Sequence, residues 1–515
     1  MKLKKNQVFC GMAALLGLSV MFSNNLGMQK VYAASPIAID STNFPDYYFC
    51  EFVETNLNTD GVPGLSDAEL AAVTEIDVSR NQIRDLTGIE YFTNLQTLKC
   101  AYQFPDINSV AGLEILDVSQ NINLTYLDCG QNELATLDVS QNTNLTYLDC
   151  AENHLSTLDV SSNTALTHLE CDTNKEIGTL DVSRNINLTH LQCGACGLAD
   201  LDVSQNTLLT YLGCAANYLT TLDVSHNSEL EELYCYWNEL TALDMSHNPK
   251  LALLWCDQQR LNNFNFDLDI TKNRALTNLM CGDNNMTNLN VSQNVALTYL
   301  ECQNNLLDSL DVSQNVELYH LYCNNNQLTQ LDISKNTGLI YLDCSNNQLS
   351  SLDASQTSIF YGEQLGQHTR WDNNQISAIM YQEPGRCYID LSSCPMLDRA
   401  MVSNVSKGTY DAATGQIDFV EPLSVGDTLT YDYATGNEDN KMTVQVTIAE
   451  IHGKDATNEP TSATEVTTAP TTESTAAPTT VSASPKTGDG KIPVGMAVMG
   501  MLSMAGYIFI SKKNR

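Results

Sequence analysis

The chain has 515 residues, with 61 acidic against 25 basic side chains and a formal net charge of −36 at pH 7. Such a surface repels nucleic acid, so we expect no nucleic-acid partner. Cationic ligands, Ca²⁺, neutral glycans and proteins stay open as partners, as does the reading that the acidic charge serves solubility alone.

The first residues have the features of a secretory signal peptide. Lys2, Lys4 and Lys5 precede an apolar run that begins at Cys10, and a small-residue cleavage site ends at Ala33. We therefore assign residues 1–33 to a signal peptide and exclude them from the fold.

Residues 35–75 are expected to form the N-terminal cap of the repeats that follow. Asn56, Asn58, Asp60 and Gly61 fit the first positions of a calcium-binding loop, although Asp67 stands where such a loop has Glu. We prefer a turn before a short helix that starts near Ser66, and calcium binding stays open as the alternative.

Residues 76–383 are dominated by one repeat. Eleven cysteines from Cys129 to Cys344 are spaced by 21, 21, 22, 21, 21, 21, 25, 21, 21 and 21 residues, within the pattern L-x-x-L-x-C-x-x-N-x-L-x-x-L-D-V-S-x-N-x-x. This is the leucine-rich-repeat signature with cysteine in the third leucine position, so it predicts a solenoid whose coils pair short parallel strands. The second half of each repeat is too short for an α-helix to fit comfortably, so we expect short extended or 3₁₀ segments on the convex side.

The alternation of a strand points the cysteines inward, where a free thiol packs as a small apolar group. Neighbouring side chains point the same way with Cβ atoms about 4.8 Å apart, beyond the ~3.5–4.5 Å of a disulfide, so we predict a reduced ladder. Cys193-x-x-Cys196 resembles half of a zinc or redox motif, but Cys196 occupies the asparagine position of its repeat. The redox state stays open for four cysteines outside the regular rungs, which are Cys50, Cys100, Cys387 and Cys394.

Two polar positions recur along the repeats. Asn132 and its counterparts are expected to satisfy buried backbone groups of a turn. Asp138 and its counterparts would repel one another at strand spacing, so we expect them to accept hydrogen bonds from turn amides or serine hydroxyls. A bound row of divalent cations is the alternative for these acids.

The outward strand positions change from polar to aromatic and apolar in the middle coils. Such side chains are frequent binding anchors when exposed, and a four-residue insertion around Phe264 and Phe266 lies beside them. The candidate ligand-binding residues of the concave face are Tyr234, Tyr236, Leu253, Trp255, Met280, Tyr299 and Tyr322. For the outer Tyr and His rungs we prefer the interpretation that stacked rings stabilise neighbouring strands.

His168 and His190 lie on adjacent rungs near Glu170, and they could bind a metal or act as an acid and a base. Repeated histidines on a ladder are more often incidental, and the sequence shows no convergent nucleophile, base and orienting group. We therefore predict no enzyme, no catalytic residue, no cofactor and no metal site.

Residues 384–453 lose the repeat and show short alternating runs, for example at 416–420 and 442–448. We expect a small β-sandwich or β-cap that shields the last coil, with ligand binding as its second possible role. Residues 454–483 are rich in Thr, Pro and Ala and have almost no large apolar side chain, so they predict an extended linker.

Residues 484–515 combine Ser-Pro-Lys-Thr-Gly, an apolar stretch at 492–510 and a basic tail. This order resembles the cell-wall sorting signal of Gram-positive surface proteins, L-P-x-T-G: Pro485, Thr487 and Gly488 match, and Ser484 departs from it. The resemblance implies that a sortase cuts after Thr487 and joins the chain to peptidoglycan. A plain transmembrane anchor is the alternative, and in either case the membrane is involved only through this segment.

The leucine-rich repeats with a cysteine ladder, together with both ends of the chain, resemble the internalin family. This resemblance implies a right-handed curved solenoid with a parallel sheet on its concave face, an Ig-like module after the repeats and display on the bacterial cell surface. Because ligands do not transfer with a fold, our functional hypothesis is general. It is a wall-anchored adhesin or binding protein that recognises a host or environmental protein or glycan with its concave face. The alternative is a structural wall-surface spacer without a specific ligand.

Overall fold

The computed structural model describes residues 36–102, 112–259, 266–359, 370–436 and 440–453. The expected signal peptide, linker and sorting signal, with Pro485, Thr487 and Gly488, lie outside these ranges. Within them, no helix is both long enough and apolar enough to cross a bilayer. The apolar stretch at 492–510 is not among the described residues.

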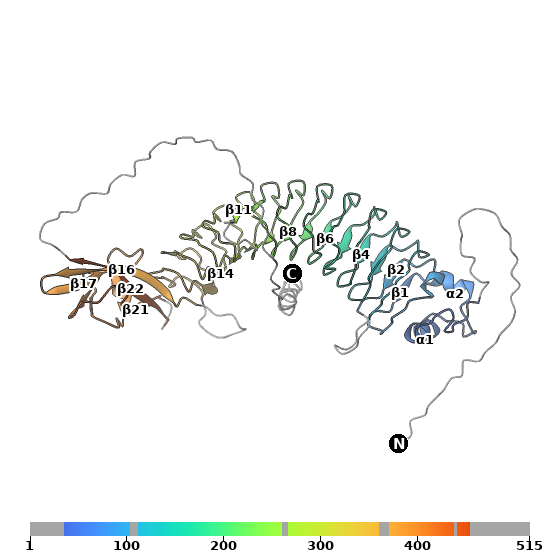
Figure 1. Ribbon diagram of the computed structural model, residues 1–515, viewed down its shortest axis with the longest axis horizontal. Helices are drawn as coiled ribbons and strands as arrows, with labels where there is room; N and C mark the ends of the chain where they lie inside the picture. The colour runs from blue at the N-terminus through green and yellow to red at the C-terminus, as the bar shows by residue number, and fades with distance from the viewer. Residues whose placement is uncertain (1–35, 103–111, 260–265, 360–369, 437–439, 454–515) are drawn as a thin grey trace, which may run out of the picture. The chain divides into compact units, whose positions relative to one another are not determined.

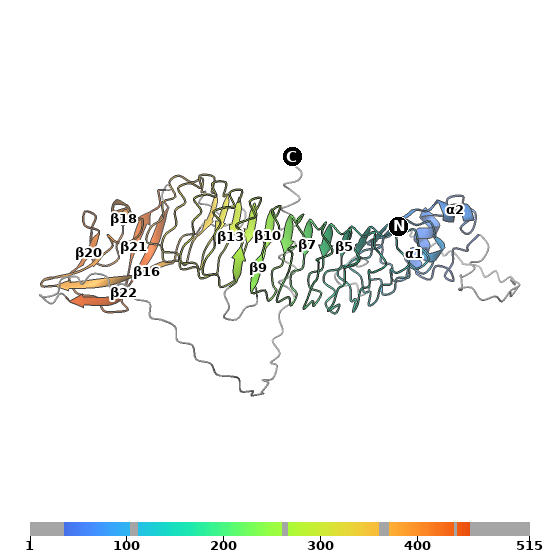
Figure 2. The same ribbon diagram turned by 90° about the horizontal axis from the view of Figure 1, so that it is seen from above.

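One parallel sheet of thirteen strands runs through the solenoid, one strand from each coil. Each strand pairs in register with the equivalent positions of the next coil, as Leu127 does with Leu148. Figures 1 and 2 show the coils following one another along a curve with their strands side by side. In chain order the strands are β1 (Glu75–Asp77), β2 (Thr97–Lys99), β3 (Tyr126–Asp128), β4 (Tyr147–Asp149), β5 (His168–Glu170), β6 (His190–Gln192), β7 (Tyr211–Gly213), β8 (Glu232–Tyr234), β10 (Leu253–Trp255), β12 (Asn278–Met280), β13 (Tyr299–Glu301), β14 (His320–Tyr322) and β15 (Tyr341–Asp343).

The opposite side of the coils consists of extended segments and turns, which agrees with the prediction. Two of the extended segments, β9 (Ala242–Asp244) and β11 (Asp267–Asp269), pair as a separate small sheet. The only 3₁₀ helix described within the repeats is η1 (Ile89–Tyr91). About ten residues must turn twice and return, and this length leaves the backbone extended.

The cysteines fill one buried position in successive coils, and every described cysteine is a free thiol. The predicted reduced ladder is therefore confirmed. Cys100 belongs to it, because its N–H bonds Asp128 O at 2.8 Å, as the N–H of Cys129 bonds Asp149 O. Val78 fills the same position one coil earlier, and Trp371 fills it after Cys344. The ladder thus begins at Val78 and ends at Trp371.

Buried asparagines join each coil to the one before it. The Nδ2 of Asn238 donates to Cys235 O at 3.0 Å in its own turn and to Cys214 O at 3.1 Å in the preceding coil, and its Oδ1 accepts from the N–H of Leu219. The same pattern recurs at Asn132 and its counterparts, so their predicted structural role is confirmed. We call this series the asparagine ladder.

Two coils replace this asparagine: Gln259 keeps its bonds, and Cys196 keeps the bond to the preceding coil. The Sγ of Cys196 lies 3.2 Å from Cys171 O, to which it donates, and the amide of Gln259 donates to Cys235 O at 3.0 Å. Cys196 is therefore a structural substitute within the repeat, as predicted.

The second asparagine of the repeat forms another buried series, which sequence reasoning missed. Asn227 is 0% exposed, and its Nδ2 donates to Val203 O and Asn206 O in the preceding coil. The aspartates between the two series lie at the surface. Asp223 accepts a 2.9 Å bond from the N–H of Ser225, which holds the pKa of this carboxyl below its usual range. The predicted hydrogen bonding of these acids is confirmed.

Two helices, α1 (Tyr47–Asn56) and α2 (Asp67–Ala72), lie at the N-terminal end of the repeats. The predicted start near Ser66 is confirmed, because Ser66 caps α2 and forms a capping box with Glu69. Glu69 also accepts bonds from the N–H groups of Thr59 and Asp60. The bonds from Ser66, followed by those from Thr59 and Asp60, lower the pKa of Glu69 to about 2. The carboxylate of Glu69 thus organises the turn that was compared with a calcium loop.

The last coil meets a seven-stranded mixed sheet. The sheet begins at Asn374, ten residues before the expected boundary, and all its strands pair in one sheet where a two-sheet sandwich was one expectation. Its strands are β16 (Asn374–Glu383), β17 (Arg386–Asp390), β18 (Val402–Ser403), β19 (Thr409–Asp411), β20 (Gln416–Phe419), β21 (Thr428–Ala434) and β22 (Lys441–Gly453), with η2 (Arg399–Met401) before β18. The sheet covers the last coil: the hydroxyl of Tyr431 donates to Ser350 O at 2.7 Å, and the indole N–H of Trp371 donates to Lys441 O.

The asparagine ladder predicts a graded effect of substitution at Asn238. N238A leaves buried carbonyls and an N–H without partners, which costs about 1–3 kcal/mol for each orphaned group. We expect a clear fall in melting temperature for N238A and a smaller fall for N238Q, since Gln259 makes the same bonds in its own coil. Thermal unfolding followed by circular dichroism measures both, and equal losses for the two variants would contradict this role.

The buried ladder also predicts how the thiols react. Burial raises the pKa of Cys214 and Cys302 to about 12, so their reactive thiolate forms are scarce and out of reach of solvent. After the native protein is blocked with iodoacetamide, we expect the ladder cysteines to be modified by a second reagent only once the chain is unfolded. Mass spectrometry counts the two labels, and extensive native labelling of the ladder would refute the buried arrangement.

Candidate ligand-binding face

The side chains that flank the buried leucine of each strand form the concave face. Of the seven predicted binding residues, six are half-buried and so offer part of their surface to a partner. Met280 is 1% exposed, and its predicted exposure is wrong. Its direct partners on the neighbouring strands are Trp255 and Glu301, so Met280 lies between these two residues.

Three of the predicted residues come together as a central aromatic cluster, which comprises Tyr234, Tyr236 and Trp255. The ring of Trp255 lies 4.4 Å from that of Tyr236 and 6.2 Å from that of Tyr234, between centroids. Leu253 belongs to the same strand as Trp255. Tyr234 and Trp255 are direct partners on the adjacent strands β8 and β10, and Tyr236 lies two residues after the end of β8.

Tyr299 and Tyr322 belong to a second group of rings beyond the coil of Met280. Their centroids are 6.1 Å apart, and both rings lie near His320, which stacks on Tyr341 at 4.6 Å. The structure therefore divides the predicted patch in two. Beside the predicted patch, Phe266 is 4% exposed and belongs to the core, and Phe264 lies outside the described residues.

Five rings on successive strands before the cluster form a continuous ring stack. Their centroids are 3.9–4.5 Å apart and their planes differ by 7–13°. The members are Tyr126, Tyr147, His168, His190 and Tyr211. Offset and stacked aromatic pairs stabilise beyond the area they bury, so the stack supports the stabilising interpretation of the outer rungs. It continues to the cluster through Tyr234, 5.2 Å from Tyr211.

An acidic groove of about 650 Å³ runs beside the ring stack. Asp128, Asp149 and Glu170 lie in register on three adjacent strands. Burial and the nearby charges of Glu170 and Asp128 together raise the pKa of Asp149 to about 7, against one backbone hydrogen bond that lowers it. The other carboxylates of the groove belong to Glu152 and Asp172.

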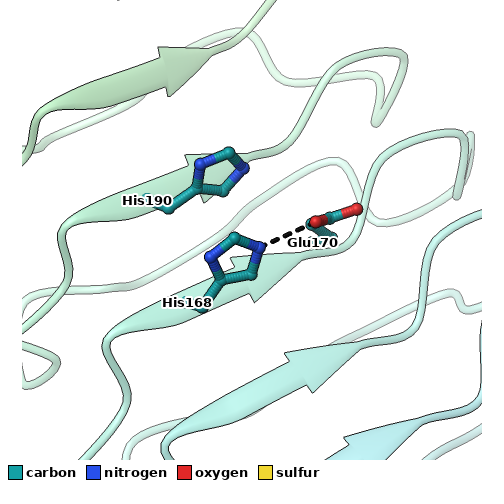
Figure 3. A group of neighbouring side chains, drawn as sticks. All are labelled: His168, Glu170 and His190. Atoms are coloured by element: carbon teal, nitrogen blue, oxygen red, sulfur yellow. Dashed lines mark hydrogen bonds and ion pairs between the residues drawn. The ribbon is translucent and has the colours of Figure 1, made fainter. Parts of the chain in front are cut away.

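Figure 3 shows His168, Glu170 and His190 near one another on two adjacent strands, and Glu170 and His190 line this groove. The Nε2 of His168 lies 2.7 Å from Oε1 of Glu170, and the two imidazole rings stack at 3.9 Å. This hydrogen bond from His168 is the main cause that lowers the pKa of Glu170. Burial lowers the pKa of His190 to about 4, so its ring is neutral at pH 7.

Asp257 occupies the position of Tyr236 in the next coil and is 6% exposed. Burial raises its pKa to about 7. Since the pKa of an unfolded aspartate is about 3.9, the folded state binds more protons between about pH 4 and 7. Asp257 therefore costs stability as pH rises through this window, and the cost stays above it.

We expect D257N to raise the free energy of unfolding at pH 8 by on the order of 1 kcal/mol and to change little at pH 4. D223N is the matched control with the opposite sign, because hydrogen bonds lower the pKa of Asp223 and its charge stabilises the fold at pH 8. Urea denaturation at the two pH values measures both. A loss of stability for D257N at pH 8 would show that its carboxylate is well solvated.

Comparisons with known proteins agree with this description. No family model and no curated protein sequence matches the chain. Among solved structures, the functional domain of InlJ from Listeria monocytogenes, which includes a cysteine ladder, is 30% identical with a TM-score of 0.59, and the match covers 81% of this chain and 100% of that one. The internalin InlF from the same organism is 22% identical with a TM-score of 0.44, over 64% of this chain and 99% of that one.

The parallel sheet, the 21-residue step and the buried thiols define a leucine-rich-repeat solenoid with a cysteine ladder. The 30% sequence identity to the InlJ domain, over the whole of that domain, narrows this class of solenoid to one family. The chain belongs to the internalin family. Its solenoid is of the type that serves as a binding scaffold.

Proposed function

We propose that this protein is a bacterial surface protein that binds a protein ligand through its concave face, with the central aromatic cluster as the anchor. The observation that supports this most is the cluster itself: three large, half-buried rings, of which Trp255 contacts the other two, Tyr234 and Tyr236. Aromatic side chains with few rotatable bonds contribute most of the binding energy in many interfaces, and they lose little entropy when already held in place.

The chemistry around the cluster favours a partner with neutral or basic surface. Asp257 lies next to Tyr236, and the acidic groove runs beside the ring stack as far as Tyr211. A partner that contacts both the central aromatic cluster and the acidic groove would pack an apolar side chain against Trp255. Its basic side chains would face Asp149 and Asp172. An acidic partner would be repelled by the chain's net charge of −36.

The proposal includes attachment to the Gram-positive cell wall. Its support is the Pro485-Lys486-Thr487-Gly488 sequence before an apolar stretch and a basic tail, with a sortase and peptidoglycan as the implied partners. A 30-residue linker, residues 454–483, would then separate the folded part from the wall.

The test is a binding screen of the full chain against extracellular-matrix proteins and a glycan array. For any saturable ligand, we expect W255A and Y236A to weaken binding at least tenfold. Y341A is the control, because Tyr341 is a ring of the same face outside the cluster. Its binding should match the unchanged chain. Each coil contacts only its neighbours, so W255A should lower the melting temperature by only a few degrees.

Binding that W255A leaves intact would overturn the role of the cluster. A ligand found only on the glycan array and lost in W255A would move the ligand class to carbohydrate. No saturable binding in either screen would favour the second candidate, a structural spacer stabilised by its ring stack and ladders.

A further inference from the structure

His168, Glu170 and His190 offer three metal-binding atoms from two adjacent strands. One nitrogen of each ring and one carboxylate oxygen all lie within 4.8 Å of one another. His168 and Glu170 are two residues apart on β5, so their side chains share a face. His190 is the direct partner of His168 on β6. The backbone therefore places the three groups together.

From this arrangement we propose that His168, Glu170 and His190 bind one divalent transition-metal ion of the zinc class. Two imidazoles and a carboxylate suit zinc, copper and nickel, whereas calcium and magnesium prefer sets of oxygen ligands. The inference is independent of the proposed ligand binding, since the central aromatic cluster contributes no atom to the site.

The three ligand atoms are near one another in the structure, but they do not yet have the separations of a bound zinc site. Ligands at about 2.0–2.2 Å from a tetrahedral ion lie about 3.4 Å apart, and the two stacked rings have nearly parallel planes. Rotation of the His190 side chain about its own bonds brings its nitrogen toward the Nε2 of His168. This movement breaks the stacking with His168 and loosens that with Tyr211, a small cost against three coordinate bonds.

The fourth coordination position opens toward the acidic groove. Glu170, His190, Gln192 and Asp172 all line that groove, and Gln192 is the direct strand partner of Glu170. Water or a donor from a bound partner could occupy this position. Three protein ligands with one open position are typical of zinc sites that bind further molecules.

The ring stack suggests the variants that test the site. Tyrosine occupies the same strand position in the coils on either side, at Tyr147 and Tyr211. H190Y and H168Y therefore remove a ligand and keep the stack. H320Y is the matched control, because it makes the same change where His320 stacks on Tyr341 in the second group of rings.

The experiment uses the full chain without a histidine tag, stripped with a chelator and titrated with Zn²⁺ by calorimetry. We expect one saturable site, a melting temperature raised by Zn²⁺ but not by Mg²⁺, and at least tenfold weaker Zn²⁺ binding in H190Y, H168Y and E170Q. H320Y should bind as the unchanged chain does. Without zinc, the melting temperature of H190Y should lie within a few degrees of that of the unchanged chain. This result would show that H190Y keeps the fold.

Two results would overturn the proposal. The first is the absence of saturable Zn²⁺ binding to the unchanged chain. The second is binding that persists in H190Y, which would assign the metal to thiols such as Cys50, Cys387 or Cys394 instead. Co²⁺ absorption distinguishes the two sites independently, since thiolate ligands add strong near-ultraviolet bands that imidazole and carboxylate lack.

Discussion

The hydrogen bonds of one buried amide per coil hold the solenoid together. Each amide of the asparagine ladder joins its own turn to two backbone groups of the preceding coil. These backbone groups are out of reach of water, so a shift of one residue would leave several of them without partners. The 21-residue step follows from this constraint. That step in turn determines the parallel register of the strands, the cysteine ladder and the side chains that face outward.

Strict register explains why like side chains meet on the concave face. Rings at the same position stack on each other, and carboxylates at the same position oppose each other's charge, as Asp128 and Asp149 do. A change at one position therefore acts through its two neighbours. Where His replaces Tyr on two adjacent rungs beside a glutamate, a stabilising stack becomes a set of metal-binding groups.

The repeat alone was sufficient to predict the solenoid, the direction of each strand residue, the free thiols and the structural role of Cys196. It was insufficient where the repeat period is broken, and where contacts with a neighbouring coil decide whether a side chain is buried. Cys100 was left outside the ladder because its distance from Cys129 in the sequence exceeds the 21-residue period by eight residues. Alternation placed Met280 on a face without showing that Trp255 and Glu301 flank it. The buried series that includes Asn227 was missed because its amide bonds only the preceding coil. Its spacing carries no sign of that contact.

The free thiols of the core also bear on mechanical load. The described cysteines form no disulfide, and Tyr431 and Trp371 seal the end of the repeats by hydrogen bonds. A pull on the C-terminal end must first break that seal, after which coils can detach one at a time. Each 21-residue coil then adds about 70 Å of extended chain. A tethered solenoid of this kind lengthens in steps under force, and it keeps the distant coils, with any ligand bound to them, intact.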